Sequence, residues 1–390
     1  MIKSFKIRNY RSLRNVVLNP GLRNIFVGPN ASGKSNSLDV FRFFRDIASL
    51  GLSRAISNRG GFSEVFWKGE STDRIIEFEL DLEMPVGSEG IVAPVQYHLA
   101  IEGSQSGLIT VKRELLKVSH ASSDVSVIDM RSGHGNVRQL DGSLAFEPSG
   151  DPSASMLDFN VPNWPGTAFK QYLIQWRYYS LIPVAMKQLK PFVRANFLEE
   201  HGENLVEYLT TLKTTYAESF REIERVAKDT FPELDQLIPE PNQTGQVLLT
   251  LREKFLRTPI TAWNMAEGEI SFIALLSLIL APAELGSPIA CVEEPENHLH
   301  PRLLETLAEL LKQTEAKFIE RGDGAAQIFA TTHSPYLVDQ FDIGDLIVVE
   351  KLRGETSYTR PRDKTELQQL ISREKLGLGE LWYSGALGGV

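Results

Sequence analysis

The sequence predicts an α/β fold with a mixed, largely parallel sheet, a β-rich lobe and a helical insert. In the last third of the chain, short apolar runs typical of buried strands alternate with apolar-periodic stretches typical of helices, and a similar pair stands near the start. Strands that alternate with helices in this way indicate a parallel sheet. The expected strands are 24–27, 289–292, 327–330 and 345–349, and the expected helices are 34–47, 271–280 and 303–318.

The first half of the chain is expected to hold most of the other strands. Residues 2–8 alternate polar and apolar side chains, as an edge strand does, and 75–118 is rich in strand-forming residues. One more short strand is expected at 125–128. Residues 131–166 are rich in Gly, Ser, Pro and Asn, so a loop-rich connector is expected there.

A single long amphipathic helix is expected from Leu205 to Ala227, where apolar residues recur every three or four positions before Pro232. The expected organisation is an N-terminal part of the main domain (1–70), a β-rich lobe (71–130), a connector (131–166), a helical insert (167–260) and a C-terminal part of the main domain (261–390).

The composition excludes several classes of protein. The chain has 390 residues, a formal net charge of −9 and one cysteine, Cys291, so an internal disulfide is excluded and a reducing, cytoplasmic location is expected. Cys291 lies in an apolar run and is expected to be a buried, unreactive side chain. The longest apolar stretch, 272–283, is shorter than the about 20 residues that cross a bilayer, and no signal peptide is visible.

Basic residues are concentrated at the start of the chain. Seven precede the first acidic residue, Asp39, and they are Lys3, Lys6, Arg8, Arg11, Arg14, Arg23 and Lys34. A basic block on an acidic protein indicates a local site for a polyanion, either a triphosphate or a nucleic-acid backbone. The alternative is a solvated strand face with alternating charges.

Residues 28–35, Gly-Pro-Asn-Ala-Ser-Gly-Lys-Ser, fit the pattern G-x-x-x-x-G-K-[ST] in full. Its glycines let backbone N–H groups surround phosphates, its lysine meets the β- and γ-phosphate oxygens, and its last hydroxyl binds Mg²⁺. The expected strand before it and helix after it supply the context that this motif requires. ATP and Mg²⁺ are the expected ligands, and the expected binding residues in the loop are Asn30, Ala31, Ser32, Gly33, Lys34 and Ser35.

Two carboxylates follow the expected strand 289–292, at the sheet edge where the phosphate-binding loop also ends. Glu293 is expected to hold Mg²⁺ through its water shell, and Glu294 to orient or deprotonate the attacking water. Two alternatives stay open. One is a solvated acidic turn, and the other is a metal cluster of Glu296, His298 and His300, for which matching Cys or His partners are missing elsewhere.

His333 follows the expected strand 327–330 in the segment Ala-Thr-Thr-His-Ser-Pro. A histidine just past a buried strand can reach a γ-phosphate as a neutral or protonated donor. A hydrolase pair of His333 with Ser334 is excluded, because adjacent residues cannot align a nucleophile with its base.

In their order along the chain, GPNASGKS, CVEEPENHLHP and ATTHSP resemble the motifs of ABC-type ATPase heads of the RecF/SMC/OLD group. More narrowly, they resemble stand-alone bacterial ATPases of that group, which often lie beside phage-defence genes. The likeness extends to 2–13, 60–69, 201–212 and the ending LGELWYSGALGG, and it is weak from 70 to 200.

The resemblance implies a homodimer with ATP sandwiched between the two copies. It places Asn9 and Arg11 near the nucleotide, Glu293 near the metal, Glu294 beside the catalytic water and His333 at the γ-phosphate. It also implies that residues 297–300 form a loop that crosses to the other subunit.

One motif departs from the group. Such heads carry a signature L-S-[GD]-G-[QT], whose serine binds the partner's γ-phosphate, whereas this chain has Met-Ala-Glu-Gly-Glu at 265–269. Gly268 and the start of the following helix remain, so backbone N–H groups can still face a phosphate. Ala266 removes the hydroxyl, and the loss of one charge-assisted hydrogen bond, about 1.5–3 kcal/mol, is expected to slow hydrolysis.

Together the motifs and the resemblance predict a cytoplasmic, Mg²⁺-dependent ATPase that dimerises on ATP, or forms a higher oligomer, and gates a separately encoded effector, such as a nuclease, in anti-phage defence. No D-x-D carboxylate pair, which the nuclease domain of OLD proteins needs, occurs in the sequence, so a head without its own effector is expected. The alternatives are an ATP-loaded scaffold with little hydrolysis, and a RecF-like DNA repair or recombination ATPase that binds DNA.

Overall fold

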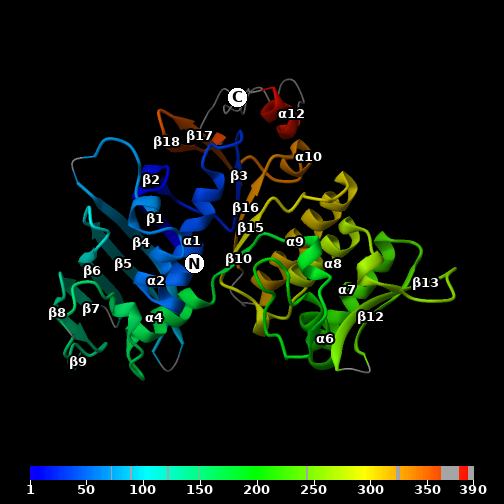
Figure 1. Ribbon diagram of the computed structural model, residues 1–390, viewed down its shortest axis with the longest axis horizontal. Coiled ribbons are helices and arrows are strands. Elements are labelled where there is room, and N and C mark those ends of the chain that lie inside the picture. Colours follow the sequence, from blue (N-terminus) through cyan, green and yellow to red (C-terminus); the bar gives the residue numbers. More distant parts are fainter. Residues whose placement is uncertain are drawn as a thin grey trace.

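The computed structural model describes all residues except 72, 88–89, 121–122, 149, 243–244, 322–325, 362–376 and 385–390. The end of the motif LGELWYSGALGG therefore lies outside the described residues. Figure 1 shows two lobes that meet at the central strands, with the N-terminal strands in the left lobe and the middle of the chain in the right lobe.

A central sheet of six strands carries the candidate site. Its order is β10-β15-β16-β3-β17-β18, and every neighbouring pair except β17 and β18 runs parallel, so the predicted parallel sheet is confirmed. Because β3, β15 and β16 are parallel neighbours, the residues that follow them meet at one edge of the sheet. The strands are β10 (Arg177–Tyr179), β15 (Ile289–Glu293), β16 (Gln327–Thr332), β3 (Arg23–Val27), β17 (Leu346–Leu352) and β18 (Glu355–Thr359).

Eight antiparallel strands form a second sheet, sheet A, in the left lobe of Figure 1. It begins with the first residues of the chain and continues past the predicted β-rich region. In sheet order the strands are β2 (Leu13–Leu18), β1 (Ile2–Tyr10), β4 (Ile75–Val86), β5 (Ile91–Gly103), β6 (Ile109–His120), β7 (Ser123–Arg131), β8 (His134–Arg138) and β9 (Leu144–Phe146).

The prediction of a loop-rich connector at 131–166 is wrong in its first part, because β8 and β9 extend sheet A there. Ser132 and Gly133 both have positive φ angles, 47° and 83°, and form the tight turn that pairs Arg131 with His134. Two-residue hairpin turns favour positive φ. The small residues therefore mark a hairpin turn rather than a long loop.

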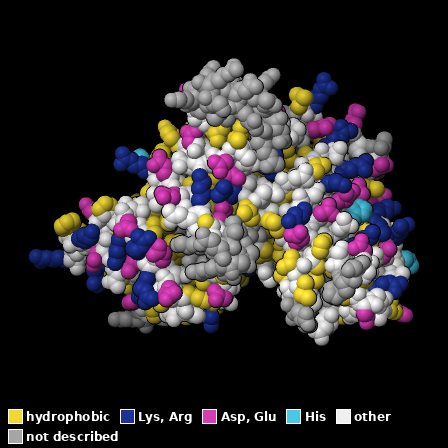
Figure 2. Space-filling view, turned by 180° about the vertical axis from the view of Figure 1, so that it is seen from behind, with side chains coloured by type: hydrophobic (Ala, Val, Ile, Leu, Met, Phe, Trp, Pro, Cys, Tyr) yellow, Lys and Arg dark blue, Asp and Glu magenta, His cyan; other side chains and the backbone are white. Residues whose placement is uncertain are grey.

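Ion pairs neutralise most of the N-terminal basic block. Six of its seven members lie within 4 Å of a carboxylate, and three of these pairs, Lys3–Glu83, Lys6–Glu79 and Arg8–Glu77, join β1 to β4. Positive and negative side chains are likewise interspersed over the lobe of sheet A, at the right in Figure 2. For these strand residues the structure favours the solvated face over a polyanion site. The other pairs are Arg11–Asp39, Arg14–Glu355 and Arg23 with Glu315 and Asp345.

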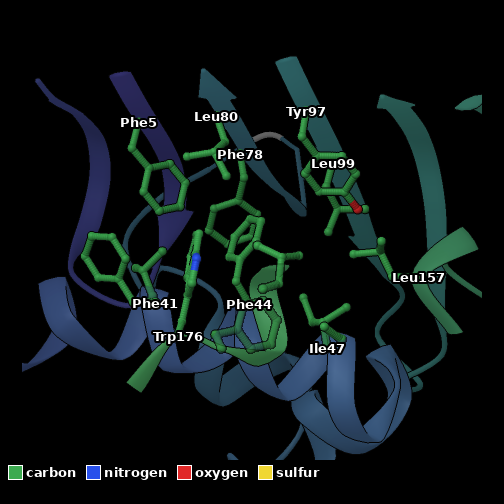
Figure 3. Close-up of a cluster of buried hydrophobic side chains, with 14 of the residues drawn as sticks. Phe5, Phe41, Phe44, Ile47, Phe78, Leu80, Tyr97, Leu99, Leu157 and Trp176 are labelled. Carbon is green, nitrogen blue, oxygen red and sulfur yellow. The ribbon is translucent and has the colours of Figure 1, made fainter. Parts of the chain in front are cut away.

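Helix α1 (Lys34–Leu50) lies between sheet A and the central sheet, and aromatic side chains fix its position (Figure 3). The ring centroid of Phe44 lies 5.3 Å from that of Phe5 in sheet A, and the ring of Phe41 lies 4.4 Å from that of Phe329 in the central sheet. Buried aromatic pairs contribute packing energy beyond the area that they bury. This packing holds the start of α1 against the ends of the parallel strands.

The segment 167–260 is mixed rather than purely helical. It holds most of α4 (Pro165–Ile174), all of α5 (Pro183–Met186), α6 (Leu205–Thr215) and α7 (Ala217–Thr230), and a small antiparallel sheet. The strands of this small sheet are β11 (Lys190–Pro191), β12 (Leu234–Pro241), β13 (Gln246–Glu253) and β14 (Ile260–Thr261).

The prediction of one long helix from Leu205 to Ala227 is wrong, because the chain leaves the helical conformation at Tyr216 (φ −125°, ψ 55°). The hydroxyls of Thr210, Thr211 and Thr214 donate to carbonyls four residues earlier. Such hydroxyl bonds weaken and bend helices, and here they precede the break. The apolar spacing continues across the break and conceals it.

Helices cover the other face of the central sheet. Leu304 and Ala308 of α9 (Pro301–Arg321) and Val338 of α10 (Pro335–Val338) pack on Ile25 and Ala330 of the strands. Among the helices that the structure describes, none combines the length and apolar character needed to cross a bilayer. The remaining helices are α2 (Leu52–Ser57), α3 (Phe62–Val65), α8 (Glu267–Ile279) and α12 (Leu378–Tyr383).

Candidate nucleotide site at the phosphate-binding loop

The phosphate-binding loop connects β3 to α1, as predicted. Gly33 immediately precedes α1 in a left-handed conformation, with φ 110°. Among the described residues, no side chain caps this helix start, and the first turn of α1 contains no acidic residue. The N–H groups of the first turn and the positive end of the helix dipole are therefore free to bind an anion.

The two glycines of the motif also allow close packing of the loop on the β17–β18 hairpin. A Cβ atom on Gly28 would lie 2.2 Å from the carbonyl oxygen of Val349, and one on Gly33 would lie 2.1 Å from Oγ1 of Thr356. Thr356 Oγ1 in turn donates a hydrogen bond of 2.8 Å to the carbonyl of Ser32. This bracing by Thr356 goes beyond the phosphate contact that the sequence predicts for the two glycines.

Lys34 is the one member of the basic block that the structure does not pair with a carboxylate within 4 Å. Its Nζ donates to the carbonyls of Gly28 and Pro29, each at 2.9 Å. Burial lowers the pKa of Lys34 to about 8, although the carboxylates of Glu294, Glu296 and Glu293 raise it. The lysine is therefore still mostly protonated at pH 7, as phosphate binding requires.

Glu293 ends β15 and Glu294 begins the loop that follows. The carboxylate of Glu293 accepts a hydrogen bond of 2.6 Å from the hydroxyl of Tyr178 on the neighbouring strand β10. Glu294 has a φ of 43°, which is uncommon for a residue other than glycine, and its N–H donates to Thr331 Oγ1. This backbone turn brings the Glu294 carboxylate toward the end of β16, as the next contact shows.

His333 lies beside Glu294, since its Nε2 is 3.5 Å from Oε1 of that carboxylate. The other carboxylate oxygen accepts a hydrogen bond of 3.0 Å from Nδ2 of Asn297. Burial and the Lys34 ammonium lower the pKa of His333, against the raising effect of Glu294 and Glu296. The structure thus brings Lys34, Glu294 and His333, which come from three distant parts of the sequence, to one edge of the central sheet.

Glu296 joins this loop to the end of β16. Its Oε1 accepts hydrogen bonds from Thr332 Oγ1 and from the N–H groups of His333 and Ser334. Within the described ranges, no group of three or more His, Cys, Asp or Glu side chains is suited to hold a metal ion, so the alternative of a cluster at Glu296, His298 and His300 is wrong. Glu296 instead fixes the backbone around His333, a role that the sequence does not predict.

Comparisons with known proteins find matches to ATPase domains. A family model described as "AAA ATPase domain" matches residues 1–132, and one described as "AAA domain, putative AbiEii toxin, Type IV TA system" matches residues 159–339. An OLD nuclease of Thermus scotoductus is 23% identical over 416 aligned residues, which cover 97% of this chain and 68% of the relative.

The fold is similar to two solved SMC heads. A head bound to the C-winged helix domain of ScpA has 13% identity and a TM-score of 0.58, over 92% of this chain and 97% of that chain. A head domain with an extended coiled coil, bound to the C-terminal domain of ScpA derived from Pyrococcus furiosus, has 12% identity and a TM-score of 0.55, over 95% and 99%. Together these likenesses support an ABC-type ATPase of the RecF/SMC/OLD group, the group that the motifs resemble.

Residues 265–269, which the sequence predicts to be an altered signature, stand at the start of α8. Ala266 precedes the helix, and its N–H donates to the carboxylate of Glu269 at 3.0 Å. A Cβ atom on Gly268 would lie 2.7 Å from the carbonyl oxygen of His298, whose Nδ1 lies 3.0 Å from the carboxylate of Glu267. The signature segment therefore packs on the loop 297–300 of its own chain, while Ala266 and Glu267 stay exposed.

Asn9 and Arg11 occupy different environments in the head. Nδ2 of Asn9 is buried and donates a hydrogen bond of 2.8 Å to the carbonyl of Ile75, the first residue of β4. This group therefore anchors β4 and does not face the phosphate-binding loop. Arg11 lies within 3.4 Å of Asn36 in the first turn of α1 and pairs with Asp39 at 3.2 Å. The structure thus brings Arg11, but not the Asn9 amide, to the start of α1.

A cleft of about 620 Å³ adjoins the start of α1. Arg11 and Asn36 line it near the phosphate-binding loop, and Trp67, Lys351 and Arg353 line the rest. The guanidinium of Arg14 lies 4.4 Å from the ring centroid of Trp67, whose indole N–H donates to the carbonyl of Gly354. The cleft is large and polar enough to take part of a nucleotide beyond its phosphates.

Proposed function

We propose that this head binds Mg²⁺ and ATP at the phosphate-binding loop, hydrolyses ATP, closes as a homodimer on the nucleotide and gates a separately encoded effector. Binding and hydrolysis of ATP are supported mainly by one observation: Lys34, Glu294 and His333 lie together beside the uncapped start of α1. The two ATPase family matches support it.

The residues present fit ATP and Mg²⁺. Ser32 Oγ is buried and has no partner among the described residues, so it can bond a phosphate oxygen. The hydroxyl of Ser35 and the carboxylate of Glu293 are hard oxygen ligands of the kind that Mg²⁺ prefers. When bound, Mg²⁺ neutralises charge on the β- and γ-phosphates.

The side chains then have distinct roles in hydrolysis. Lys34 binds the β- and γ-phosphate oxygens. Glu294 orients a water molecule and takes one of its protons while the water oxygen bonds to the γ-phosphorus and the bond to the ADP oxygen breaks. His333 donates a hydrogen bond to the γ-phosphate and is held beside Glu294 by the contacts of Glu296. The nucleoside part of ATP occupies the cleft between Arg11 and Arg353.

Exposed apolar side chains around the signature support closure of two copies on the nucleotide. Trp263, just before the signature, is 53% exposed, and Val184 of α5 is 65% exposed. The two segments are joined by the hydrogen bond from Lys187 Nζ to the carbonyl of Met265. Exposed apolar side chains on neighbouring segments agree with the proposed interface.

The effector part of the proposal rests on the relatives. One family description names a toxin of a type IV toxin–antitoxin system, and the sequence relative is named a nuclease, of which about a third lies outside the match. An anti-phage role agrees with both names. DNA binding receives no support from the N-terminal basic block, because six of its seven members are paired with carboxylates.

A second candidate is an ATP-loaded scaffold that hardly hydrolyses ATP, and the specific observation that favours it is Ala266 in place of the signature serine. Steady-state phosphate release with Mg²⁺ and ATP separates the two. The ATPase proposal expects turnover in the wild type that is lost in Glu294→Gln. ATP binding without turnover above that of Glu294→Gln would favour the scaffold.

A further inference from the structure

Tyr178 connects the candidate metal ligand to the rest of the fold. It lies in the middle of β10, opposite Cys291 in the parallel pairing with β15, and is 7% exposed. Its hydroxyl donates a hydrogen bond of 2.6 Å to Oε2 of Glu293. The other carboxylate oxygen of Glu293, Oε1, has no hydrogen-bond partner among the described residues, so the tyrosine leaves this oxygen free.

The ring of Tyr178 is itself held in place. The guanidinium of Arg42, on α1, lies 5.4 Å from the ring centroid. Arg42 in turn forms an ion pair of 2.7 Å with Glu200, whose backbone carbonyl accepts the N–H of Ser180 just after β10. Three segments therefore restrict the position of the tyrosine: the strand that bears it, the helix that follows the phosphate-binding loop and the segment around Glu200.

We propose that Tyr178 is a positioning residue for the divalent cation, which fixes Oε2 of Glu293 so that Oε1 is presented to the metal site. This inference rests on the proposed function, since it requires Mg²⁺ beside the bound nucleotide. Holding a carboxylate in one orientation before a ligand arrives lowers the ordering cost of binding, and partners that orient metal ligands commonly change metal affinity. Removing the hydroxyl leaves the ring packing intact and takes away only this restraint.

The test is Mn²⁺ affinity in the presence of ADP, measured by electron paramagnetic resonance, with nucleotide affinity in EDTA measured alongside. Tyr178→Phe is expected to weaken Mn²⁺ binding about 2- to 10-fold, which is the change in affinity produced by the loss of one net hydrogen bond. The affinity for ADP without metal should stay unchanged. Tyr179→Phe is the matched control, because Tyr179 is a buried tyrosine on the same strand and no hydrogen bond of its hydroxyl is found in the described structure. It should change neither affinity.

A double-mutant cycle completes the test. In a Glu293→Ala background no carboxylate remains to be positioned, so Tyr178→Phe should weaken Mn²⁺ binding no further. Equal Mn²⁺ affinity in Tyr178→Phe and wild type would overturn the inference and leave the proposed function standing. An equal loss of Mn²⁺ and metal-free ADP affinity would also overturn it, because it would show a general structural role. If wild type itself binds no Mn²⁺ with ADP, the proposed function falls and this inference falls with it.

Discussion

Nε2 of His333 lies 3.5 Å from Oε1 of Glu294, and the pairing of β15 with β16 produces this contact. Glu293 is opposite Thr331 in that parallel pair, so the residues that follow each strand end at the same level of the sheet. Strand register, the backbone turn at Glu294 and the hydrogen bonds of Glu296 thus place side by side the proposed donor to the γ-phosphate and the proposed base for the attacking water.

Glu294→Gln should bind ATP but hardly hydrolyse it, because an amide cannot accept the proton of the attacking water while Glu293 still supports Mg²⁺. The ATP-bound dimer should therefore accumulate. Light scattering should show an ATP-dependent doubling of mass for this variant, with the mass before ATP addition as the control. If wild type and variant both stay monomeric with ATP, the sandwich model is wrong.

Ala266→Ser tests the altered signature. Glu269 already accepts the N–H of Ala266, so a serine would complete an S-x-x-E capping box and raise the free energy of unfolding by about 1 kcal/mol. In a closed dimer its hydroxyl can also reach the partner's γ-phosphate. We then expect kcat to rise several-fold to about tenfold, with little change in ATP affinity.

The control for that change is Ala217→Ser, which places a serine at the exposed start of α7. It should leave kcat unchanged. A stability gain in Ala266→Ser without any change in kcat, in a protein whose Glu294→Gln dimer forms normally, would show that the signature segment does not reach the partner's nucleotide. The scaffold alternative would then lose its main support.

Glu114 predicts a pH dependence of stability away from the site. It is fully buried, and burial raises its pKa from 4.5 to about 7, although it accepts hydrogen bonds from Met156, Ser155 and Tyr97. The folded state therefore holds the proton more tightly than the unfolded state. Its stabilising contribution is complete below pH 4.5 and is lost as the pH rises through 7, by roughly 3 kcal/mol.

Denaturant unfolding at pH 5 and pH 8 measures this contribution. The difference in unfolding free energy between wild type and Glu114→Gln should change by roughly 2.5 kcal/mol between the two pH values, because the amide does not titrate and a small part of the contribution is already lost at pH 5. Glu102→Gln, at a more exposed site on the same sheet, serves as the control and should show little change. Parallel pH profiles for wild type and Glu114→Gln would contradict the assignment.

Local patterns were enough to predict the parallel sheet and the main site motifs. The phosphate-binding loop and the residues after β15 and β16 each follow a short apolar strand, and parallel strands bring their ends together without further information. The helix break at Tyr216 escaped prediction because apolar spacing continues across it. The hairpin after Arg131 escaped prediction because turn residues are also typical of loops.

The contacts missed at the site are long-range. Tyr178 bonds Glu293 only because β10 pairs with β15, and nothing in the local sequence around Tyr178 indicates that pairing. Thr356 braces the phosphate-binding loop from the far end of the chain. Glu296 is recognisable in the sequence as a third carboxylate of the acidic motif. Its hydrogen bonds could not be predicted, because its three donors come from β16 and the loop after it.

The most direct test of the account is the ATP affinity of Lys34→Ala, measured by calorimetry with Mg²⁺ and compared with wild type. Lys6→Ala is the control, since Lys6 pairs with Glu79 on the exposed face of sheet A and should not affect binding. Because Lys34 is proposed to be the principal cation for the β- and γ-phosphates, its removal should weaken ATP binding by about 10- to 150-fold, the effect of losing one hydrogen bond to a charged group, or abolish it. Equal ATP affinity in Lys34→Ala and wild type would contradict the assignment of the phosphate-binding loop and, with it, the proposed function.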